Sequence, residues 1–395
     1  MKGWLVDGSL ASRQEFVAAQ KLADGVRCFR RRPHWFAGRF DDQTVVKLRA
    51  TSDLRFHPDV QLQPCTTPRR LQPKLSRKWF RSFCNTNQLV SPGLNEVVEQ
   101  IGAPQAWSRA TGSDTYIAIV DSGINGLNLE FPAWKKAGGW SYDNSFPWND
   151  STGHGTMCAV IAAGCPRNPL AKLCGVAPDA LLYSCKTDYQ SSTIIDAYDW
   201  IQDQHDQHGR PIIVSNSFGF ETTTPPEEDG EPVTPDHPFV VVLRELVARK
   251  LPVVFAAGNN HPENKPRSRK PDRIWAWNSL PEVFTVAEVD RKERVRPYSS
   301  RGPGQWASAS HPKPDCAAPA FGWVLIQDQY SKVIEGWGTS GAAPQAAGLL
   351  AMLKEQRPDF EPAVLYQRIR DKARKVPQPW NCVGSGILDC WHAVY

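Results

Sequence analysis

The sequence lacks any long apolar run. No segment approaches the roughly 18 consecutive apolar residues that a membrane-spanning helix needs. Residues 1–8 do not form a secretory signal peptide either, because the apolar run that starts at Trp4 breaks at Asp7. We therefore expect a soluble protein without a membrane partner, intracellular as written and exported only if a leader precedes Met1.

The sequence also lacks the cysteine and histidine spacings that are typical of zinc sites. It contains ten cysteines, but none of them falls in a CxxC motif. We assign no metal and no cofactor, and structural calcium stays open because Asp143, Asn144, Asn149 and Asp150 form a loose polar group. A solvated loop is the better interpretation of that group, since it does not form a compact calcium loop.

The even cysteine count permits disulfides. Cys165–Cys174 and Cys382–Cys390 are the closest local pairs. Buried free thiols are an equal alternative, because cysteine is also a common core residue. Cysteine usage thus leaves both the disulfide pattern and the cellular compartment undecided.

A strong charge of one sign is absent. The 46 basic and 41 acidic side chains give a formal net charge of +5, which does not indicate a nucleic-acid partner. The densest basic stretches are residues 30–32, 69–81 and 265–273, and we interpret each as a solvated loop. The apolar fraction of 41% is ordinary for a globular protein, so a sizeable core is expected.

The sequence does contain a change of pattern near residue 65. Residues 1–65 alternate strands with a helix, which predicts a small α+β domain. The strands and the helix are expected at residues 4–6, 12–23, 43–48 and 57–62. Residues 66–92 are basic, polar and proline-containing, and they predict a linker.

Residues 93–395 alternate short apolar strands with helices. The strands are expected at residues 116–120, 181–186, 211–214, 252–256 and 283–286. The helices are expected at residues 156–163, 191–204, 239–250 and 342–356. Because the strands are mostly apolar, they predict a mostly parallel sheet covered by helices on both faces. The polar, proline-rich residues 221–237 indicate a surface insertion.

Four polar residues stand where such a sheet carries functional groups. Asp121 and Asn259 follow strands, and parallel α/β sheets bind their ligands at the carboxyl ends of strands. His154 lies between two glycines just before a helix, and Ser340 stands at the mouth of a helix of small residues. Taken singly, each residue also has a structural interpretation, as a cap, a turn residue or a packing residue.

The order Asp, His, Ser along the chain is the order found in subtilisin. The three residues stand in the motifs Val120-Asp121-Ser122-Gly123, His154-Gly155-Thr156 and Gly338-Thr339-Ser340, the last followed by Ala342-Ala343-Pro344. With these motifs, and with residues 298–303 and 313–319, the chain from about residue 103 to residue 391 resembles the subtilisin-like serine peptidases (subtilases). The resemblance implies a subtilisin-like three-layer α/β fold and the activity of a serine endopeptidase.

The resemblance also implies a role for each of the four residues. Ser340 would be the nucleophile and His154 the base that removes its proton. Asp121 would hold the imidazole in one tautomer without taking its proton. Asn259 and the backbone N–H of Ser340 would bind the oxyanion that develops on the substrate.

Two further runs resemble substrate-binding elements of the family. The strand that pairs with an extended protein or peptide substrate comprises Ser217, Phe218 and Gly219. The wall of the primary specificity pocket comprises Ala256, Ala257 and Gly258.

Three positions near the motifs need separate treatment. Gly341 stands where the family commonly has methionine, and Gln345 stands where it commonly has histidine. Neither is a catalytic group. We therefore expect these two departures to affect the shape of the pocket and the packing of the helix, and not the activity. Cys158 is expected to face the core, with a second reactive nucleophile as the alternative.

Residues 1–65 resemble the inhibitory propeptide of this family, chiefly at residues 35–40, 45–49 and 58–60. The resemblance implies a ferredoxin-like domain that inhibits its own peptidase domain, residues 93–395, as in a zymogen. Its tail would lie in the substrate site like a product, and the cut would fall between about Cys65 and Pro92. We expect the protein to be a monomer.

Two other functions remain open. A catalytically silent pseudopeptidase, acting as a binding module, is disfavoured because all four chemical groups are present. A transpeptidase (macrocyclase) on the same fold would use the same residues, so the sequence does not separate ligation from hydrolysis.

Overall fold

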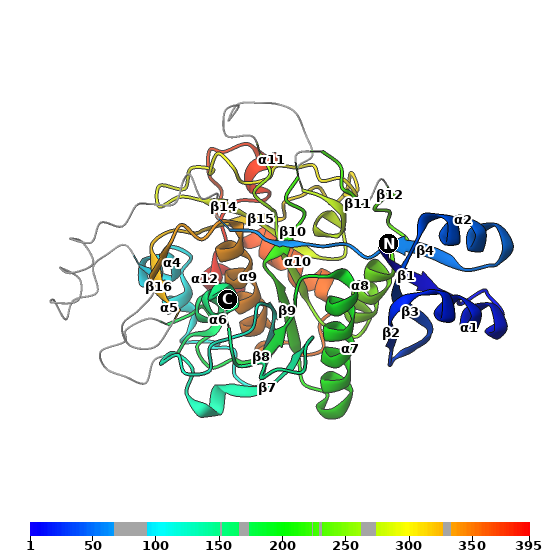
Figure 1. The fold of residues 1–395 in the computed structure, drawn as a ribbon. Helices are drawn as coiled ribbons and strands as arrows, with labels where there is room; N and C mark the ends of the chain where they lie inside the picture. The colour runs from blue at the N-terminus through cyan, green and yellow to red at the C-terminus, as the bar shows by residue number, and fades with distance from the viewer. Residues whose placement is uncertain are drawn as a thin grey trace, which may run out of the picture.

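The computed structural model describes residues 1–66, 93–150, 152–165, 174–222, 224–228, 231–261, 274–326 and 333–395. The N-terminal region is a four-stranded antiparallel sheet with two helices (Figure 1). Its elements are β1 (Lys2–Asp7), α1 (Arg13–Leu22), β2 (Asp24–Phe29), β3 (Arg32–Phe40), α2 (Asp42–Thr51) and β4 (Arg55–Pro58). This βαββαβ succession, with strand order β2-β3-β1-β4, confirms the predicted ferredoxin-like α+β region.

The prediction of a strand at residues 43–48 is wrong, because these residues form the middle of α2. Asp41 caps this helix: its carboxylate accepts a hydrogen bond from the backbone N–H of Thr44 at 2.9 Å. Val45 is buried and Val46 is exposed, as on an amphipathic helix. The cap and the helical period therefore outweigh the strand preference of the two valines.

The larger part of the chain is built around a seven-stranded sheet in which every neighbouring pair is parallel. Its strands are β6 (Tyr116–Asp121), β7 (Lys136–Ser141), β8 (Leu181–Lys186), β9 (Ile212–Asn216), β13 (Val253–Ala256), β14 (Phe284–Val289) and β15 (Cys316–Pro319). They lie in the order β15-β14-β13-β9-β6-β8-β7. All five predicted strands are present, so the predicted parallel α/β sheet is confirmed.

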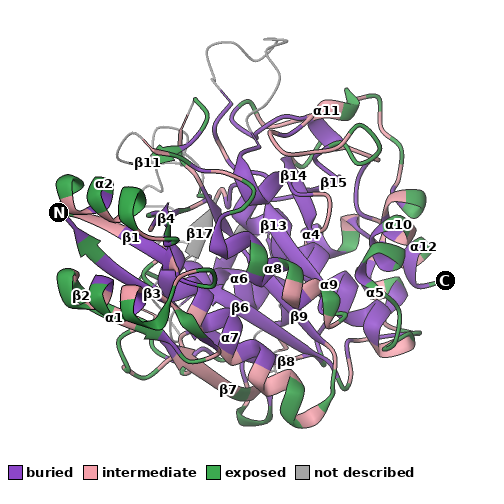
Figure 2. Ribbon diagram, turned by 90° about the vertical axis from the view of Figure 1, so that its right-hand side faces the viewer, coloured by how far each residue is buried: buried purple, intermediate pink, exposed green. Residues whose placement is uncertain are grey.

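Helices cover both faces of this sheet (Figures 1 and 2). On one face, α6 (His154–Ala163) and α9 (Thr339–Gln356) share an apolar core with the strands. On the other face, α7 (Ser191–His208) and α8 (Pro238–Ala248) contribute to a second core. The chain therefore forms the predicted three layers, with α9 buried along nearly its whole length.

The remaining elements are short or peripheral. The helical ones are α4 (Leu94–Gln100), α5 (Ala103–Ala106), η2 (Ala133–Lys135), η3 (Ala276–Ser279), α10 (Pro362–Lys372), α11 (Trp380–Val383) and α12 (Cys390–Val394). The strands are β5 (Gln63–Pro64), β10 (Phe218–Gly219), β11 (Glu227–Glu228), β12 (Glu231–Pro232), β16 (Trp323–Leu325) and β17 (Val333–Glu335). The predicted insertion at residues 221–237 thus contains the small β11–β12 hairpin.

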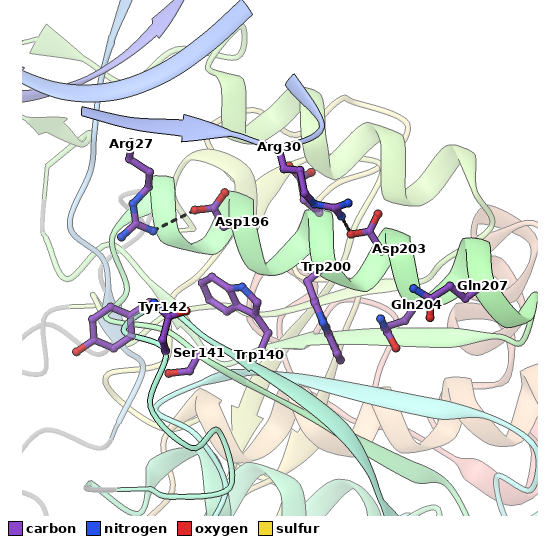
Figure 3. A pocket seen from close by; sticks show the side chains of 12 residues that line it. Arg27, Arg30, Trp140, Ser141, Tyr142, Asp196, Trp200, Asp203, Gln204 and Gln207 are labelled. Atoms are coloured by element: carbon purple, nitrogen blue, oxygen red, sulfur yellow. Dashed lines mark hydrogen bonds and ion pairs between the residues drawn. The ribbon is translucent and has the colours of Figure 1, made fainter. Parts of the chain in front are cut away.

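Arginines of the N-terminal region lie against acidic residues of α7. Figure 3 shows Arg27 paired with Asp196, at 3.0 Å, and Arg30 paired with Asp203. Burial raises the pKa of Asp196 to about 6, even though Arg27 acts in the opposite direction. The two parts of the chain therefore meet through a surface of complementary charge.

Arg32 occupies the most enclosed position in this interface. Its side chain is 8% exposed and pairs with Asp199 of α7 and Glu245 of α8. The prediction that residues 30–32 form a solvated loop is therefore wrong at Arg32. A basic run cannot reveal its partners from sequence alone when they lie more than 160 residues away.

Within the described residues, no helix combines the length and apolarity required to cross a membrane. Cys382 and Cys390 are buried free thiols, and Cys174 is a free thiol as well. Neither of the two disulfides left open by the sequence is therefore formed. The predicted linker lies outside the described residues except for Thr66.

Candidate active site

Two of the predicted site residues, Asp121 and His154, meet at the end of the parallel sheet. Asp121 is the last residue of β6, and His154 is the first residue of α6. The Nδ1 atom of His154 lies 2.7 Å from Oδ1 of Asp121. Both side chains are buried, so the structure holds this pair away from solvent.

The same oxygen of Asp121 also accepts hydrogen bonds from two other residues, Ser122 and Tyr189. The backbone N–H of Ser122 donates to Oδ1 at 2.8 Å, and the hydroxyl of Tyr189 donates to it at 2.8 Å. Nothing in the sequence pattern singled out Tyr189, because it lies 68 residues away in a polar turn. A backbone signal is visible only in the structure, where Tyr189 has a φ of 66°, rare for a residue with a side chain.

The pKa of His154 reflects opposing influences. Burial lowers it, whereas the charge and hydrogen bond of Asp121, together with the charge of Asp150, raise it above the ordinary value of 6.5. The net direction is upward. The surroundings therefore favour a protonated imidazole, which is the form a general base reaches after it takes a proton.

Asp150 organises the loop that leads into α6. Its Oδ1 accepts hydrogen bonds from the backbone N–H groups of Thr152 and Gly153, and from the hydroxyl of Ser122. Its Oδ2 accepts the N–H and hydroxyl of Thr156. Asp150 was one of the loose calcium candidates, but here its carboxylate is engaged by protein donors at the helix start.

Ser340 lies at the start of α9 and is fully buried. Its hydroxyl donates to the backbone carbonyl of Ser217 at 2.9 Å, and the Ser217 hydroxyl donates to the Ser340 carbonyl at 3.0 Å. Among the residues that the structure describes, His154 Nε2 has no hydrogen-bond partner. The structure therefore forms the predicted Asp121–His154 contact, but it does not form a hydrogen bond between His154 and Ser340.

Asn259 follows β13 and reaches the start of α9. Its Oδ1 accepts hydrogen bonds from the backbone N–H and the hydroxyl of Thr339, at 3.2 and 3.1 Å. Its Nδ2 donates to the backbone carbonyl of Thr66 at 2.6 Å. The Thr339 hydroxyl also accepts the N–H of Gly258, so the two predicted motifs are joined directly.

Gly258 has a φ of 97°, in the region that favours glycine. A Cβ atom on it would lie about 3 Å from side-chain atoms of Ser300 and Asn260. Ala256 and Ala257 precede it and are buried. The run predicted to line the specificity pocket is therefore tightly packed on both sides.

The segment after β4 runs along the predicted substrate strand. β5 pairs with β10 in antiparallel fashion, with Gln63 opposite Gly219 and Pro64 opposite Phe218. Ahead of it, the N–H of Leu62 donates to the carbonyl of Tyr189 at 2.9 Å. An extended segment of the chain therefore lies where the sequence predicted that substrate would pair.

Cys65 lies at the end of this segment, beside the candidate nucleophile. Its N–H donates to the carbonyl of Ser217 at 2.9 Å, and its carbonyl accepts the N–H of Ser340 at 3.1 Å. The side chain of Cys65 is buried, which raises the pKa of its thiol to about 12. The peptide group that follows Cys65 therefore lies between Ser340 and Asn259.

The two departures from the family pattern have physical explanations. A Cβ atom on Gly341 would lie 2.4 Å from Cβ of Trp337, so no larger residue fits there. Gln345 donates from Nε2 to the carbonyls of Pro319 and Gly341, at 2.5 and 2.8 Å. Both residues therefore serve packing around α9.

Cys158 is buried, as predicted, and its Sγ lies 3.9 Å from Oδ2 of Asp121. Burial and the charge of Asp121 raise the pKa of this thiol well above its ordinary value, so it stays neutral. Among the described residues, the one group of three potential metal ligands within 4.8 Å of one another is Asp121, His154 and Cys158. Asp121 and His154 are already hydrogen-bonded to each other, and the neutral thiol of Cys158 is a poor metal ligand.

A model of the subtilase family matches residues 112–386, which is more than half of the chain. The chain belongs to the subtilase family. Family membership and the serine proteases among its relatives make this subtilase a serine-type hydrolase. Its activity as a peptidase implies peptide or protein substrates.

Several curated relatives are similar to this subtilase over most of its length. Subtilisin-like protease SBT6.1 of Arabidopsis thaliana is 27% identical over 72% of this chain and 26% of its own. Serine protease AprX of Bacillus subtilis is 25% identical over 72% of this chain and 67% of its own. Mycosin-1 of Mycobacterium tuberculosis is 27% identical over 73% of this chain and 70% of its own. The subtilase thus spans only about a quarter of the plant relative.

Solved structures of MycP1 share the fold. A crystal structure with the N-terminal propeptide removed has a TM-score of 0.58 and 22% identity, covering 76% of this chain and 97% of that one. The structure of MycP1 from the ESX-1 type VII secretion system has a TM-score of 0.60 and 20% identity, covering 86% and 91% of the two chains. These values confirm the subtilisin-like fold.

Proposed function

We propose that this subtilase is a serine endopeptidase that cleaves its own chain before it acts on other proteins or peptides. One observation carries the proposal: Gln63 and Pro64 pair with β10, the N–H of Cys65 donates to the carbonyl of Ser217, and the carbonyl of Cys65 accepts the N–H of Ser340. An extended peptide held by main-chain hydrogen bonds beside a serine is how a peptidase binds its substrate. The bond between Cys65 and Thr66 is therefore the proposed cleavage site.

Ser340 acts as the nucleophile in this proposal. Its hydroxyl leaves the carbonyl of Ser217 and turns toward Nε2 of His154, which has no hydrogen-bond partner in the described part of the chain. Catalytic hydrogen bonds are often long or misaligned before the reaction begins, so the present orientation is compatible with the role. The oxygen then attacks the carbonyl carbon of Cys65 as its proton passes to His154.

Asp121 supports the base. Its contact with Nδ1 of His154 fixes the tautomer that leaves Nε2 able to accept a proton. The carboxylate then stabilises the imidazolium, in keeping with the raised pKa of His154. Asp121 itself does not take up the proton.

Asn259 and Ser340 supply the donors for the oxyanion. The N–H of Ser340 already reaches the carbonyl of Cys65, and Nδ2 of Asn259 donates to the next carbonyl, that of Thr66. Negative charge on the Cys65 oxygen would draw the Asn259 amide across to it. The Ser340 N–H is thus in place before the charge develops, and a donor prepared in advance stabilises the transition state most strongly.

The reaction ends in two steps. The bond between Cys65 and Thr66 breaks, His154 returns its proton to the new amino group of Thr66, and Cys65 remains as an ester on Ser340. Water then attacks this ester, gives a proton to His154, and releases the carboxyl group of Cys65. Ser340 recovers its proton, so the peptidase is ready for another substrate.

The N-terminal region would remain as an inhibitor after this cut. Its tail keeps the strand pairing with β10, and its arginines keep their contacts with α7. Other substrates would gain access only after the region dissociates or is degraded. We accordingly propose residues 1–65 as a propeptide and residues 93–395 as the peptidase domain.

Serine-directed labelling tests the proposal. A fluorophosphonate should label Ser340 of the self-processed wild-type chain once its N-terminal region has been removed, and the Ser340→Ala variant should take up no label. Failure to label a folded wild-type chain freed of this region would favour the pseudopeptidase. Masses of products from a peptide library would then separate hydrolysis from ligation, because a transpeptidase joins peptides instead of releasing carboxyl ends.

A further inference from the structure

Tyr189 lies in the turn between β8 and α7, at the border of the candidate active site. Its φ of 66° is rare for a residue with a side chain, and its N–H donates to the Thr187 hydroxyl at 2.7 Å. Such strained backbone conformations persist where surrounding contacts impose them. The turn therefore holds Tyr189 in one defined orientation.

The side chain of Tyr189 reaches inward to Asp121. Its hydroxyl donates to Oδ1 at 2.8 Å, the same oxygen that lies 2.7 Å from Nδ1 of His154. The other side chains that influence the hydroxyl are those of Ser122 and Cys158. Burial and the charge of Asp121 raise the pKa of Tyr189 well above 10, so the phenol remains a neutral donor.

The main chain of Tyr189 reaches outward to the bound segment. Its carbonyl accepts the N–H of Leu62 at 2.9 Å. If Cys65 is P1, the residue whose carbonyl is attacked, then Leu62 is P4. The ring of Tyr189 also packs edge-on against Phe218 of β10, with centroids 5.9 Å apart.

We propose that Tyr189 is a positioning residue that links occupation of the P4 backbone site to the orientation of Asp121 and thereby of His154. The inference rests on the proposed function, since it assigns these residues their catalytic roles. A peptide that reaches P4 bonds to the carbonyl of Tyr189 and steadies the turn. The steadied turn holds the hydroxyl against Asp121, so longer substrates react faster once bound.

The Tyr189→Phe variant removes the hydroxyl and leaves the backbone contact to P4 in place. We expect kcat for a tetrapeptide substrate to fall about tenfold, because a hydrogen bond to a charged group is lost. KM should change little. The acidic limb of the pH profile should also move to higher pH, because Asp121 with one donor fewer stabilises the imidazolium of His154 more strongly.

Peptide length provides the decisive comparison. In the wild-type chain, kcat should be higher for a substrate that fills P4 to P1 than for one that fills only P2 and P1. In the Tyr189→Phe variant, the ratio of kcat for the longer substrate to kcat for the shorter one should approach one. Tyr183→Phe is a matched control, because its hydroxyl bonds instead to Nε2 of His208, and it should keep the wild-type ratio.

A modified substrate tests the same link without altering the protein. A tetrapeptide with an N-methyl group at P4 cannot donate to the carbonyl of Tyr189, so the wild-type chain should lose kcat with it. The inference would be overturned if kcat were unchanged with this substrate, or if the Tyr189→Phe variant kept the wild-type pH profile and the wild-type ratio of kcat for long and short substrates. Either result would leave the proposed function intact. A wild-type chain that hydrolyses no peptide even after its N-terminal region has been removed would overturn the proposed function, and the inference with it.

Discussion

The buried carboxylate of Asp121 is surrounded by donors. His154, Ser122 and Tyr189 all reach the same oxygen at 2.7–2.8 Å. A carboxylate that accepts several hydrogen bonds keeps its direction in a buried place. The consequence extends to His154, whose pKa is raised above 6.5 despite its burial.

The raised pKa of His154 predicts the pH dependence of peptide hydrolysis. His154 acts as a base only when neutral, so activity is full above its pKa and is lost as the pH falls through it. We expect kcat/KM, measured between about pH 5 and 9, to rise with a midpoint above the ordinary value of 6.5. A midpoint below 6.5 would contradict the assignment of His154 as the base.

The proposed role of Asn259 in binding the oxyanion predicts a loss of kcat when this residue is replaced. Replacing it with alanine should lower kcat by about 10²–10³, the loss measured for an oxyanion-hole asparagine in subtilisin itself. KM should stay nearly constant, because the donor acts on charge that develops only during the reaction. Asn260→Ala is the control: its Nδ2 donates to the carbonyl of Phe220, so kcat should be retained. Equal losses in both variants would argue against the oxyanion role.

At the scale of elements, the loop before α6 sets the position of His154. Asp150 accepts the N–H groups of Thr152, Gly153 and Thr156, and it also holds the hydroxyl of Ser122 next to Asp121. One carboxylate thus fixes the start of the helix and the turn after β6. The two residues of the Asp121–His154 pair are therefore positioned from both sides.

Replacement of Asp150 by alanine should weaken this arrangement. We expect a loss of about 1–2 kcal/mol in the free energy of unfolding, as for other helix caps, together with a lower kcat. Asp143→Ala serves as the control, because that exposed carboxylate bonds to Ser141 and Ser145 within its own turn and pairs with Lys186 of β8 at 4.0 Å. Denaturant unfolding and peptide hydrolysis measure the two effects. A stable Asp150→Ala variant with full activity would refute the positioning role.

Elements with a strong pattern could be predicted from the sequence, and weakly patterned ones could not. The five predicted strands are mostly apolar because both faces of the sheet are covered, and these apolar runs are visible in the sequence. β7 includes Gly138 and Gly139, and β15 has only four small residues, so neither carries such a signal. Residues 43–48 were assigned to a strand because Val45 and Val46 favour one locally, whereas the Asp41 cap starts a helix.

The residues of the candidate active site also fall into those that the sequence could predict and those that it could not. Asp121, His154, Asn259 and Ser340 could be proposed because each stands in a short motif at a strand or helix end. Tyr189 and Asp150 could not, because their roles depend on contacts that fold and turn geometry create. The partners of Arg32 were equally hidden, since they lie far along the chain on α7 and α8.

At the scale of the whole molecule, the N-terminal region is held by charge as well as by its tail. Arg32 is nearly enclosed and faces two carboxylates, Asp199 and Glu245. Burial raises the pKa of Asp199, against the influence of Arg32, which shows how strongly this carboxylate is shielded. Removing the arginine would leave a buried charge without its partner.

The Arg32→Ala variant should therefore release the N-terminal region more readily. Breaking a buried pair costs about 3–5 kcal/mol, so inhibition should weaken by about 100-fold or more. Arg39→Ala is the matched control, because its exposed partner Asp24 lies within the same region. The rate at which peptidase activity appears in the full chain measures the effect. Identical rates for both variants would show that the interface does not hold the region.

Intact-mass analysis of the full chain tests the central claim most directly. The wild-type chain should yield a fragment of residues 1–65 and a second fragment that begins at Thr66, because the bond after Cys65 lies beside Ser340. The Ser340→Ala variant should remain a single chain of 44.1 kDa. A wild-type chain that stays intact and yet hydrolyses peptides, or a Ser340→Ala chain cut at the same bond, would contradict the proposal.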